Sequence, residues 1–169
     1  TALNDVVLIE QNFGIVFVLL NPGSSNLQVG TIVIADVFST DGFFEIPTSA
    51  TSFRGANGQN NLAWSDVLAP TNTVGFGQIV VGLNNGSGIF RDLFQFRQFV
   101  ATPGITNISG GDFNNDGIED LAYIDFNSNF AAVALNDTTD FFLSPRFRET
   151  GGFQPVSAAV GDFNDDDNL

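Results

Sequence analysis

The sequence predicts an all-β protein, and three observations support this prediction. Short runs rich in Val, Ile and Phe alternate with clusters of Gly, Asn, Asp, Ser and Pro, which is typical of many short strands joined by turns. No stretch has the periodicity of an amphipathic helix, so we expect helices to be absent or limited to a single turn. Three segments also share one layout, which indicates a repeated unit.

The expected strands follow from the apolar runs. Residues 15–20 form the longest such run near the start of the chain, which indicates a buried strand. This run is too short to cross a bilayer as a helix and has no basic flank, so it is neither a membrane span nor a signal peptide. The other candidate strands lie at 6–9, 31–38, 62–65, 78–83, 121–126 and 131–135.

The repeated layout is an acidic or amide residue, an apolar strand, a turn, a second apolar strand and then Leu-Asn. It occurs at 5–21, 61–84 and 120–136, with the leading residues 56 and then 59 positions apart. A period of roughly 50 to 60 residues with about four strands matches one blade of a β-propeller. We therefore expect residues 1–169 to belong to one β-propeller domain with roughly three blades of about four antiparallel strands each. The approximate units are a partial blade at 1–45, blades at 46–104 and 105–156, and the start of another at 157–169.

Ring closure takes about four to eight blades. A chain with roughly three blades is therefore expected to be either a fragment of a larger propeller or a set of blades completed by other chains. We favour the fragment.

The most specific motif is the acidic loop from Asp112 to Asp120. Oxygen ligands recur at alternate positions, a pattern that suits Ca²⁺, which needs six to eight oxygens at about 2.3 to 2.6 Å. Gly117 permits the sharp turn, and the loop holds four carboxylates without a cation, so it should repel itself when no metal is bound. The candidate ligands are Asp112, Asn114, Asp116, the main-chain carbonyl of Ile118, and Asp120.

The same residues have two alternative interpretations, a turn without metal and an EF-hand. An Asx-rich turn without metal would use the same residue types. An EF-hand would require flanking helices and a Glu at the twelfth loop position, where this sequence has Tyr123. We favour calcium because the alternation of ligands, the glycine and the strand that follows agree.

A second acidic loop begins 50 residues later, at Asp162. Its candidate ligands are Asp162, Asn164, Asp166 and the carbonyl of Asn168. The closing ligand would be residue 170, which supports the expectation of a truncated chain. Asp167 stands at the position of the turn glycine, and an L-residue adopts the left-handed conformation less readily than Gly.

The middle unit has a related segment at 53–61 that keeps Gly58 and several amides but contains no carboxylate. We expect no metal there. Arg54 either supplies a positive charge in place of the cation or, as we favour, is a solvated side chain.

The composition of the chain excludes several classes of partner and of catalytic site. The net charge of −14 argues against nucleic acid and anionic membranes as partners, and the chain contains no His and no Cys. A Ser-His-Asp triad and a His- or Cys-ligated zinc site are therefore excluded within these residues. Any catalysis would depend on carboxylates, Arg, Tyr123 or a bound metal.

These residues resemble the FG-GAP or VCBS repeat, the blade unit of integrin-α-type propellers and of many secreted proteins. The resemblance lies in Gly-Asp-Phe-Asn-Asn-Asp-Gly-Ile-Glu-Asp-Leu-Ala at 111–122, Gly-Asp-Phe-Asn-Asp-Asp at 161–166 and Leu-Asn-Asn-Gly-Ser-Gly-Ile-Phe at 83–90. It implies a calcium loop between the first and second strands of a blade. It also implies an extracellular, cell-surface or periplasmic location.

We therefore expect a non-catalytic calcium-binding module for adhesion, protein–protein interaction or structural assembly, with a protein or neighbouring subunits as partner and no direct membrane insertion. One alternative is a glycan-binding propeller in which Trp64 or Tyr123 stacks on sugars, although core packing is the favoured role for both. Another is the scaffold domain of a secreted polysaccharide-processing enzyme.

Overall fold

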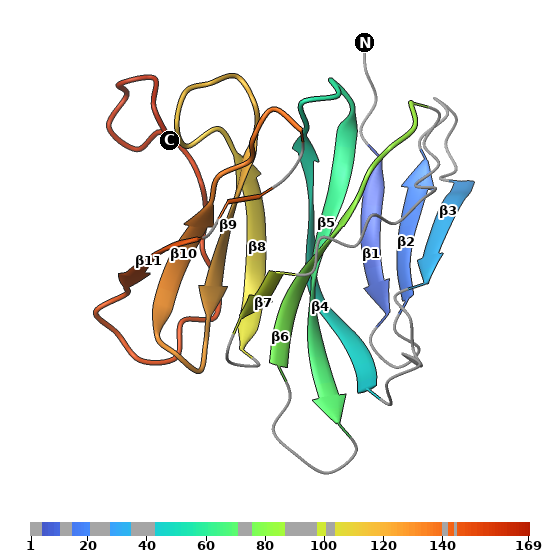
Figure 1. The fold of residues 1–169 in the computed structure, drawn as a ribbon, viewed down its shortest axis with the longest axis horizontal. Coiled ribbons are helices and arrows are strands. Elements are labelled where there is room, and N and C mark those ends of the chain that lie inside the picture. The colour runs from blue at the N-terminus through green and yellow to red at the C-terminus, as the bar shows by residue number, and fades with distance from the viewer. Residues whose placement is uncertain are drawn as a thin grey trace.

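The computed structural model describes residues 5–10, 15–20, 28–34, 43–70, 76–86, 98–100, 104–139, 142–143 and 145–169. Within these residues the chain forms eleven strands and no helix (Figure 1). The strands make three antiparallel sheets, so the predicted all-β class is confirmed. The described part of the chain does not close into a barrel or a ring.

In each sheet, strands that follow one another in the chain are neighbours in the sheet. Sheet 1 contains β1 (Val6–Glu10), β2 (Ile15–Leu20) and β3 (Gln28–Ile34). Sheet 2 contains β4 (Phe43–Arg54), β5 (Asn60–Pro70), β6 (Phe76–Gly82) and β7 (Gln98–Val100). Sheet 3 contains β8 (Ile105–Gly111), β9 (Asp120–Asp125), β10 (Phe130–Ala134) and β11 (Arg146–Glu149).

Each of the seven expected strands overlaps an observed one, and 15–20 matches β2 at both ends. The expected strand 31–38 overlaps β3, but its positions 35–38 lie outside the described residues. The sequence does not predict β4, β7, β8 or β11. In β4 and β8 the reason is their Ser, Thr and Gly content, which is typical of turns.

Sheet 2 lies between the other two sheets and packs on both of them. Toward sheet 1, it forms an apolar cluster of Val16, Val18, Leu62, Trp64 and Val80. Toward sheet 3, it forms a larger cluster that includes Phe53, Ala63, Val81, Leu121 and Tyr123. Successive residues of β5 enter the two clusters in turn, as the alternation of side chains along a strand requires.

The contact between sheets 2 and 3 runs along β4 and β8, whose polar side chains pair with main chain. Thr48 Oγ1 donates to the carbonyl of Ile105 at 2.7 Å, and the N–H of Ile108 donates to Ser49 Oγ at 3.1 Å. The approach is so close that a Cβ on Gly110 would lie 2.8 Å from the carbonyl oxygen of Ser52. Hydroxyl groups and a glycine therefore contribute to this contact beside the apolar cluster. A search of the sequence for apolar residues alone does not identify them.

Candidate functional site

The acidic loop from Asp112 to Asp120 connects β8 to β9 at one rim of the sheets (Figure 1). Its chain reversal uses two residues in the left-handed region, Asn115 with φ 61° and Gly117 with φ 85°. Asn and Gly are the residues that adopt this conformation at least cost. The expected role of Gly117 in the turn is therefore borne out by the backbone.

Three of the predicted ligand side chains gather inside this turn. The N–H of Asp116 donates both to Asp112 Oδ1 at 3.2 Å and to Asn114 Oδ1 at 2.9 Å. The N–H of Gly117 donates to Asp112 Oδ2 at 2.8 Å, and the N–H of Ile118 donates to Asp116 Oδ1 at 2.8 Å. Asn114 Nδ2 donates to Asp116 Oδ2 at 2.9 Å. The loop thus brings two carboxylates and an amide together around its own main chain.

The fourth side chain, Asp120, is fully buried at the start of β9. Its Oδ1 accepts the N–H of Asn136 at 2.8 Å and its Oδ2 accepts the N–H of Phe113 at 2.9 Å. Burial raises the pKa of Asp120, and the negative charges of Asp116 and Asp112 act in the same direction, against the two N–H groups. Asp120 is therefore within electrostatic reach of the other two carboxylates.

Acidic side chains by themselves do not complete a metal site. Among the described residues, no group of three or more His, Cys, Asp or Glu side chains is placed to hold a metal ion. The predicted ligand set has three carboxylates, one amide and one carbonyl, and the carboxylate of Asp120 is held at its strand by two N–H groups. Ile118 contacts Asp116 through its N–H, whereas the sequence predicts its carbonyl as the ligand.

Four hydrogen bonds of the first acidic loop recur at the equivalent positions of the second. The N–H of Asp166 donates to Asp162 Oδ1 at 3.2 Å, and the N–H of Asp167 donates to Asp162 Oδ2 at 2.8 Å. The N–H of Asn168 donates to Asp166 Oδ1 at 2.9 Å, and Asn164 Nδ2 donates to Asp166 Oδ2 at 2.8 Å. All four predicted residues of this loop are thus brought together.

The backbone of the second loop is more strained than that of the first. Asp167 has φ 62° at the place where the first loop has Gly117. An L-residue there costs up to roughly 1–2 kcal/mol relative to glycine. Hydrogen bonds from the side chains of Asn164 and Asn168 lower the pKa of Asp166, so its carboxylate stays charged near neutral pH.

The middle segment at 53–61 closes in a different way. The N–H of Gly58 donates to the carbonyl of Gly55 at 2.9 Å, and the side-chain amides of Asn57 and Asn61 hydrogen-bond each other at 3.3 and 3.4 Å. Neutral amides satisfy one another here without a cation. Arg54 is exposed, and its main chain, rather than its guanidinium, makes the contact with the neighbouring loop described next.

The three loops lie in a row along the same rim, and each touches the next. The N–H of Arg54 donates to Glu119 Oε2 at 2.7 Å, and the N–H of Glu119 donates back to the carbonyl of Arg54 at 3.0 Å. At the other side, Asn115 Nδ2 donates to Asn168 Oδ1. Glu119, counted from the sequence only as one more loop charge, therefore joins two sheets.

A further residue of the site that the sequence does not identify is the asparagine that ends the repeated layout. Asn136 donates its side-chain N–H to the carbonyl of Glu119 at 3.1 Å while its main-chain N–H holds Asp120. Asn84 makes the same pair of bonds in sheet 2, to the carbonyl of Asn60 at 3.1 Å and to Asn61 Oδ1 at 3.0 Å. In the sequence, this asparagine can be recognised from the Leu-Asn pair that ends the repeated layout. In the structure, its hydrogen bonds hold the loop against the end of the second apolar strand.

Aromatic residues considered as surface contacts belong to the interior. Trp64 and Tyr123 are both 1% exposed, which confirms core packing and removes them as sugar-stacking platforms. Burial, with a smaller contribution from the charge of Asp125, raises the pKa of Tyr123, so this hydroxyl stays protonated near neutral pH. Phe142 is also buried and packs edge-to-face on Phe53, with ring centroids 5.5 Å apart. Its neighbour Phe141 lies outside the described residues.

No protein-family model matches the chain, and neither the curated proteins nor the solved structures contain a significant match. None of the described segments forms a helix with the length and apolar character needed for a membrane span.

Proposed function

We propose that this chain is a calcium-binding β-propeller module that works without catalysis, in adhesion, protein–protein interaction or structural assembly. The observation that carries the proposal is the recurrence of one acidic loop at 112–120 and at 162–168, in which four hydrogen bonds join equivalent atoms. A turn that merely connected two strands would not need to preserve the side-chain pattern around a strained backbone.

Support for a propeller comes from the way successive strands stack. Ile105 and Ile108 of β8 bond to Thr48 and Ser49 of β4, as described above. Fifty residues further along, the carbonyl of Pro155 accepts from Thr106 Oγ1 at 3.3 Å and the N–H of Ala158 donates to Asn107 Oδ1 at 3.4 Å. The segment 155–160 thus lies on β8 as β8 lies on β4, which is the relation expected between the first strands of successive blades.

Support for calcium comes from the oxygen atoms of the first loop. A carboxylate offers about four lone-pair sites, so the oxygens of Asp112, Asp116 and Asp120 that accept N–H groups keep capacity for a cation. Ca²⁺ takes six to eight oxygen ligands in flexible geometry, and the carbonyl of Ile118 and the amide oxygen of Asn114 extend the set. A divalent ion would also offset the burial and, to a smaller extent, the repulsion from Asp116 and Asp112, which together raise the pKa of Asp120.

The consequence of binding would be mechanical. Each loop touches its neighbour through Glu119 with Arg54 or through Asn115 with Asn168, so a cation that fixes one loop also holds the junction with the adjacent sheet. Such a rim presents a rigid surface to a protein partner. An extracellular, cell-surface or periplasmic setting, where calcium is abundant, is proposed from the FG-GAP or VCBS resemblance.

The test is thermal unfolding of the chain at increasing Ca²⁺, with Mg²⁺ as the competing ion. For an affinity of about 10⁻⁴ M, 10 mM Ca²⁺ is about 100 times Kd and stabilises by about 2.7 kcal/mol. This corresponds to a rise in Tm of roughly 5–11 °C at 2–4 °C per kcal/mol. Asp116→Asn should lose most of this rise, whereas Glu149→Gln, an exposed acid on β11, should keep it. A Tm that does not change with Ca²⁺ concentration would refute the calcium site.

A further inference from the structure

Glu119 lies between two candidate ligands of the first acidic loop, the carbonyl of Ile118 and the carboxylate of Asp120. Its N–H belongs to the same peptide unit as the Ile118 carbonyl, and its own carbonyl belongs to the same peptide unit as the Asp120 N–H. A peptide unit is planar and rigid, so a contact made by either group of Glu119 also fixes the neighbouring residue. Glu119 can therefore orient two ligands without being a ligand itself.

On one side, Glu119 is held by the main chain of sheet 2. Its carboxylate Oε2 accepts the N–H of Arg54 at 2.7 Å, and its N–H donates to the carbonyl of Arg54 at 3.0 Å. Arg54 is the last residue of β4, so both bonds join the loop to the end of one strand. A hydrogen bond to an ionised carboxylate is roughly twice as strong as a neutral one. Together the two bonds set the distance and the direction of the contact.

These bonds determine the direction of the Ile118 carbonyl. In a trans peptide unit, the C=O and the N–H point to opposite sides of the chain. Because the N–H of Glu119 points to Arg54, the carbonyl of Ile118 points away from that residue. Sheet 2 thus orients a candidate ligand that belongs to the loop of sheet 3.

On the other side, Glu119 is held by sheet 3. Its carbonyl accepts the side-chain N–H of Asn136 at 3.1 Å, and the main-chain N–H of Asn136 donates to Asp120 Oδ1 at 2.8 Å. Asp120 itself is fully buried at the start of β9. The two ligands that flank Glu119 are therefore positioned from different sheets, Ile118 from sheet 2 and Asp120 from sheet 3.

The two sheets are in close contact beside Glu119. A Cβ on Gly110 would lie 2.8 Å from the carbonyl oxygen of Ser52 and 3.4 Å from Glu119 Oε2. The carboxylate thus lies where β4 and β8 leave no room for a side chain at residue 110. A shift of the sheets at this point would change the distance between Glu119 and Arg54. The geometry of the loop therefore depends on the packing of sheets 2 and 3.

We propose that Glu119 is a positioning residue for calcium, which joins the first acidic loop to the main chain of sheet 2 so that calcium affinity depends on the junction between sheets 2 and 3. The inference rests on the proposed calcium site. Coupling between binding and a conformational equilibrium is reciprocal, so calcium must stabilise the junction by the factor by which the junction strengthens calcium binding. Replacing a residue that orients metal ligands typically changes the affinity by about 10–100-fold.

The experiment compares two replacements of Glu119 that separate its contact from its charge. Glu119→Gln keeps an oxygen that can accept the N–H of Arg54 but removes the charge. Glu119→Asp keeps the charge, but its side chain is one methylene shorter and withdraws the acceptor from Arg54. Isothermal titration calorimetry measures the Kd for Ca²⁺ of each folded chain. Glu119→Asp should raise the Kd by about tenfold or more, whereas Glu119→Gln should stay close to the wild type.

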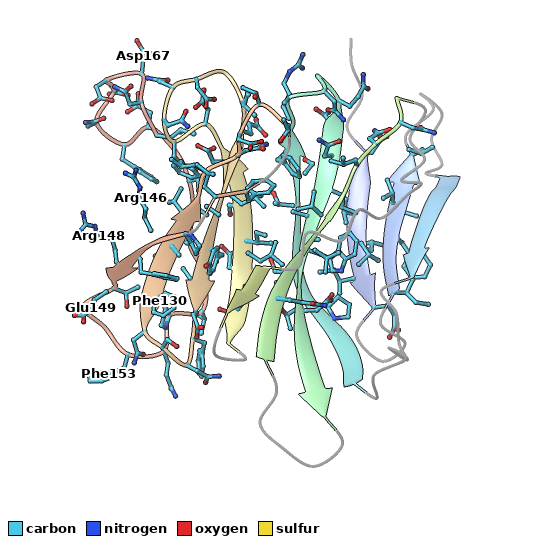
Figure 2. The ribbon with its side chains drawn as sticks, in the orientation of Figure 1. Phe130, Arg146, Arg148, Glu149, Phe153 and Asp167 are labelled. Atoms are coloured by element: carbon cyan, nitrogen blue, oxygen red, sulfur yellow. The ribbon has the colours of Figure 1, made fainter. Side chains whose placement is uncertain are left out.

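Glu149→Gln is the matched control, because it removes the same charge from an exposed position on β11. Figure 2 shows Glu149 well away from the rim on which Asp167 of the second acidic loop lies. The Kd of this control should equal that of the wild type. If Glu119 acted through its charge or as a direct ligand, Glu119→Gln would bind calcium more weakly than Glu119→Asp. That order would overturn the inference. Circular dichroism establishes that each variant is folded.

Hydrogen exchange of the wild-type chain tests the reciprocal effect without any replacement. Saturating Ca²⁺ should slow exchange of the Arg54 N–H by the factor by which Glu119→Asp raises the Kd, because opening of the junction then also loses that affinity. The N–H of Thr150, which donates to the carbonyl of Asn129 at 3.0 Å at the other end of sheet 3, is the reference and should not change. An exchange rate at Arg54 that calcium leaves unchanged would contradict the inference.

Calorimetry of the wild type separates this inference from the proposed function. A wild type that binds no Ca²⁺ would reject both. A wild type that binds Ca²⁺ with the same Kd as both Glu119 variants would reject the role of Glu119 and leave the calcium site standing.

Discussion

Gly110 lies at the closest approach of β4 and β8, and replacing it with Ala tests the stacking of sheets on which the propeller proposal depends. A Cβ at this position would lie 2.8 Å from the carbonyl oxygen of Ser52, 3.2 Å from Phe53 Cβ and 3.4 Å from Glu119 Oε2. The first two atoms belong to a strand that cannot move aside without breaking its pairing with β5. Sheets 2 and 3 would therefore have to separate by a few tenths of an ångström.

Overpacking of this kind typically costs about 1–3 kcal/mol. For a chain of this length that corresponds to a fall in Tm of roughly 2–12 °C. Gly152→Ala is the matched control, because a Cβ there meets no atom within 4 Å and its φ is not in the left-handed region. The control should leave Tm unchanged or raise it slightly through reduced entropy of the unfolded chain.

The assay is thermal unfolding of both variants in the same buffer without calcium, so that metal binding does not contribute. Equal Tm values for Gly110→Ala, Gly152→Ala and the wild type would mean that β4 and β8 do not approach as described. The proposed stacking of blades would then lack its main contact.

Gly117→Ala should lower the free energy of unfolding by about 1 kcal/mol, because its φ of 85° is strained for alanine although no atom lies within 4 Å of the added Cβ. Asp167→Gly should raise the free energy of unfolding by a similar amount, because glycine adopts the φ of 62° without strain. Chemical denaturation measures both, and changes of the same sign would contradict the equivalence of the two loops. Asn136→Ala and Asn84→Ala should each cost about 1 kcal/mol, since each loses its side-chain hydrogen bond to a loop carbonyl. If the free energy of unfolding is unchanged for either variant, that asparagine does not stabilise its loop.

The row of loops connects the proposed calcium binding with the stacking of the sheets. At the rim, two hydrogen bonds between Glu119 and Arg54 hold the junction of sheets 2 and 3, and an apolar cluster holds it further from the rim. Four carboxylates in one loop weaken the rim unless their charge is offset. Cation binding would therefore act where the stack is least supported by burial.

The sequence by itself determined the class of the fold and the residues of the acidic loops. Strand β2 and the turn at Gly117 follow from local rules, namely apolar runs, turn residues and the left-handed freedom of glycine, which act over a few positions. The recurrence of Asp, Asn and Asp at alternate positions is equally local. Such features can be recognised in a sequence because neighbours along the chain are the atoms that interact.

The tertiary structure decided what depends on contacts between residues roughly 55 to 90 positions apart. The hydroxyls of Thr48 and Ser49 make β4 a strand against β8, although their composition favours a turn. Glu119 becomes a link to Arg54, and Phe142 enters the core against Phe53. These outcomes are set by the stacking of sheets, because polar side chains and aromatic rings acquire a role only when the opposite surface supplies the partner.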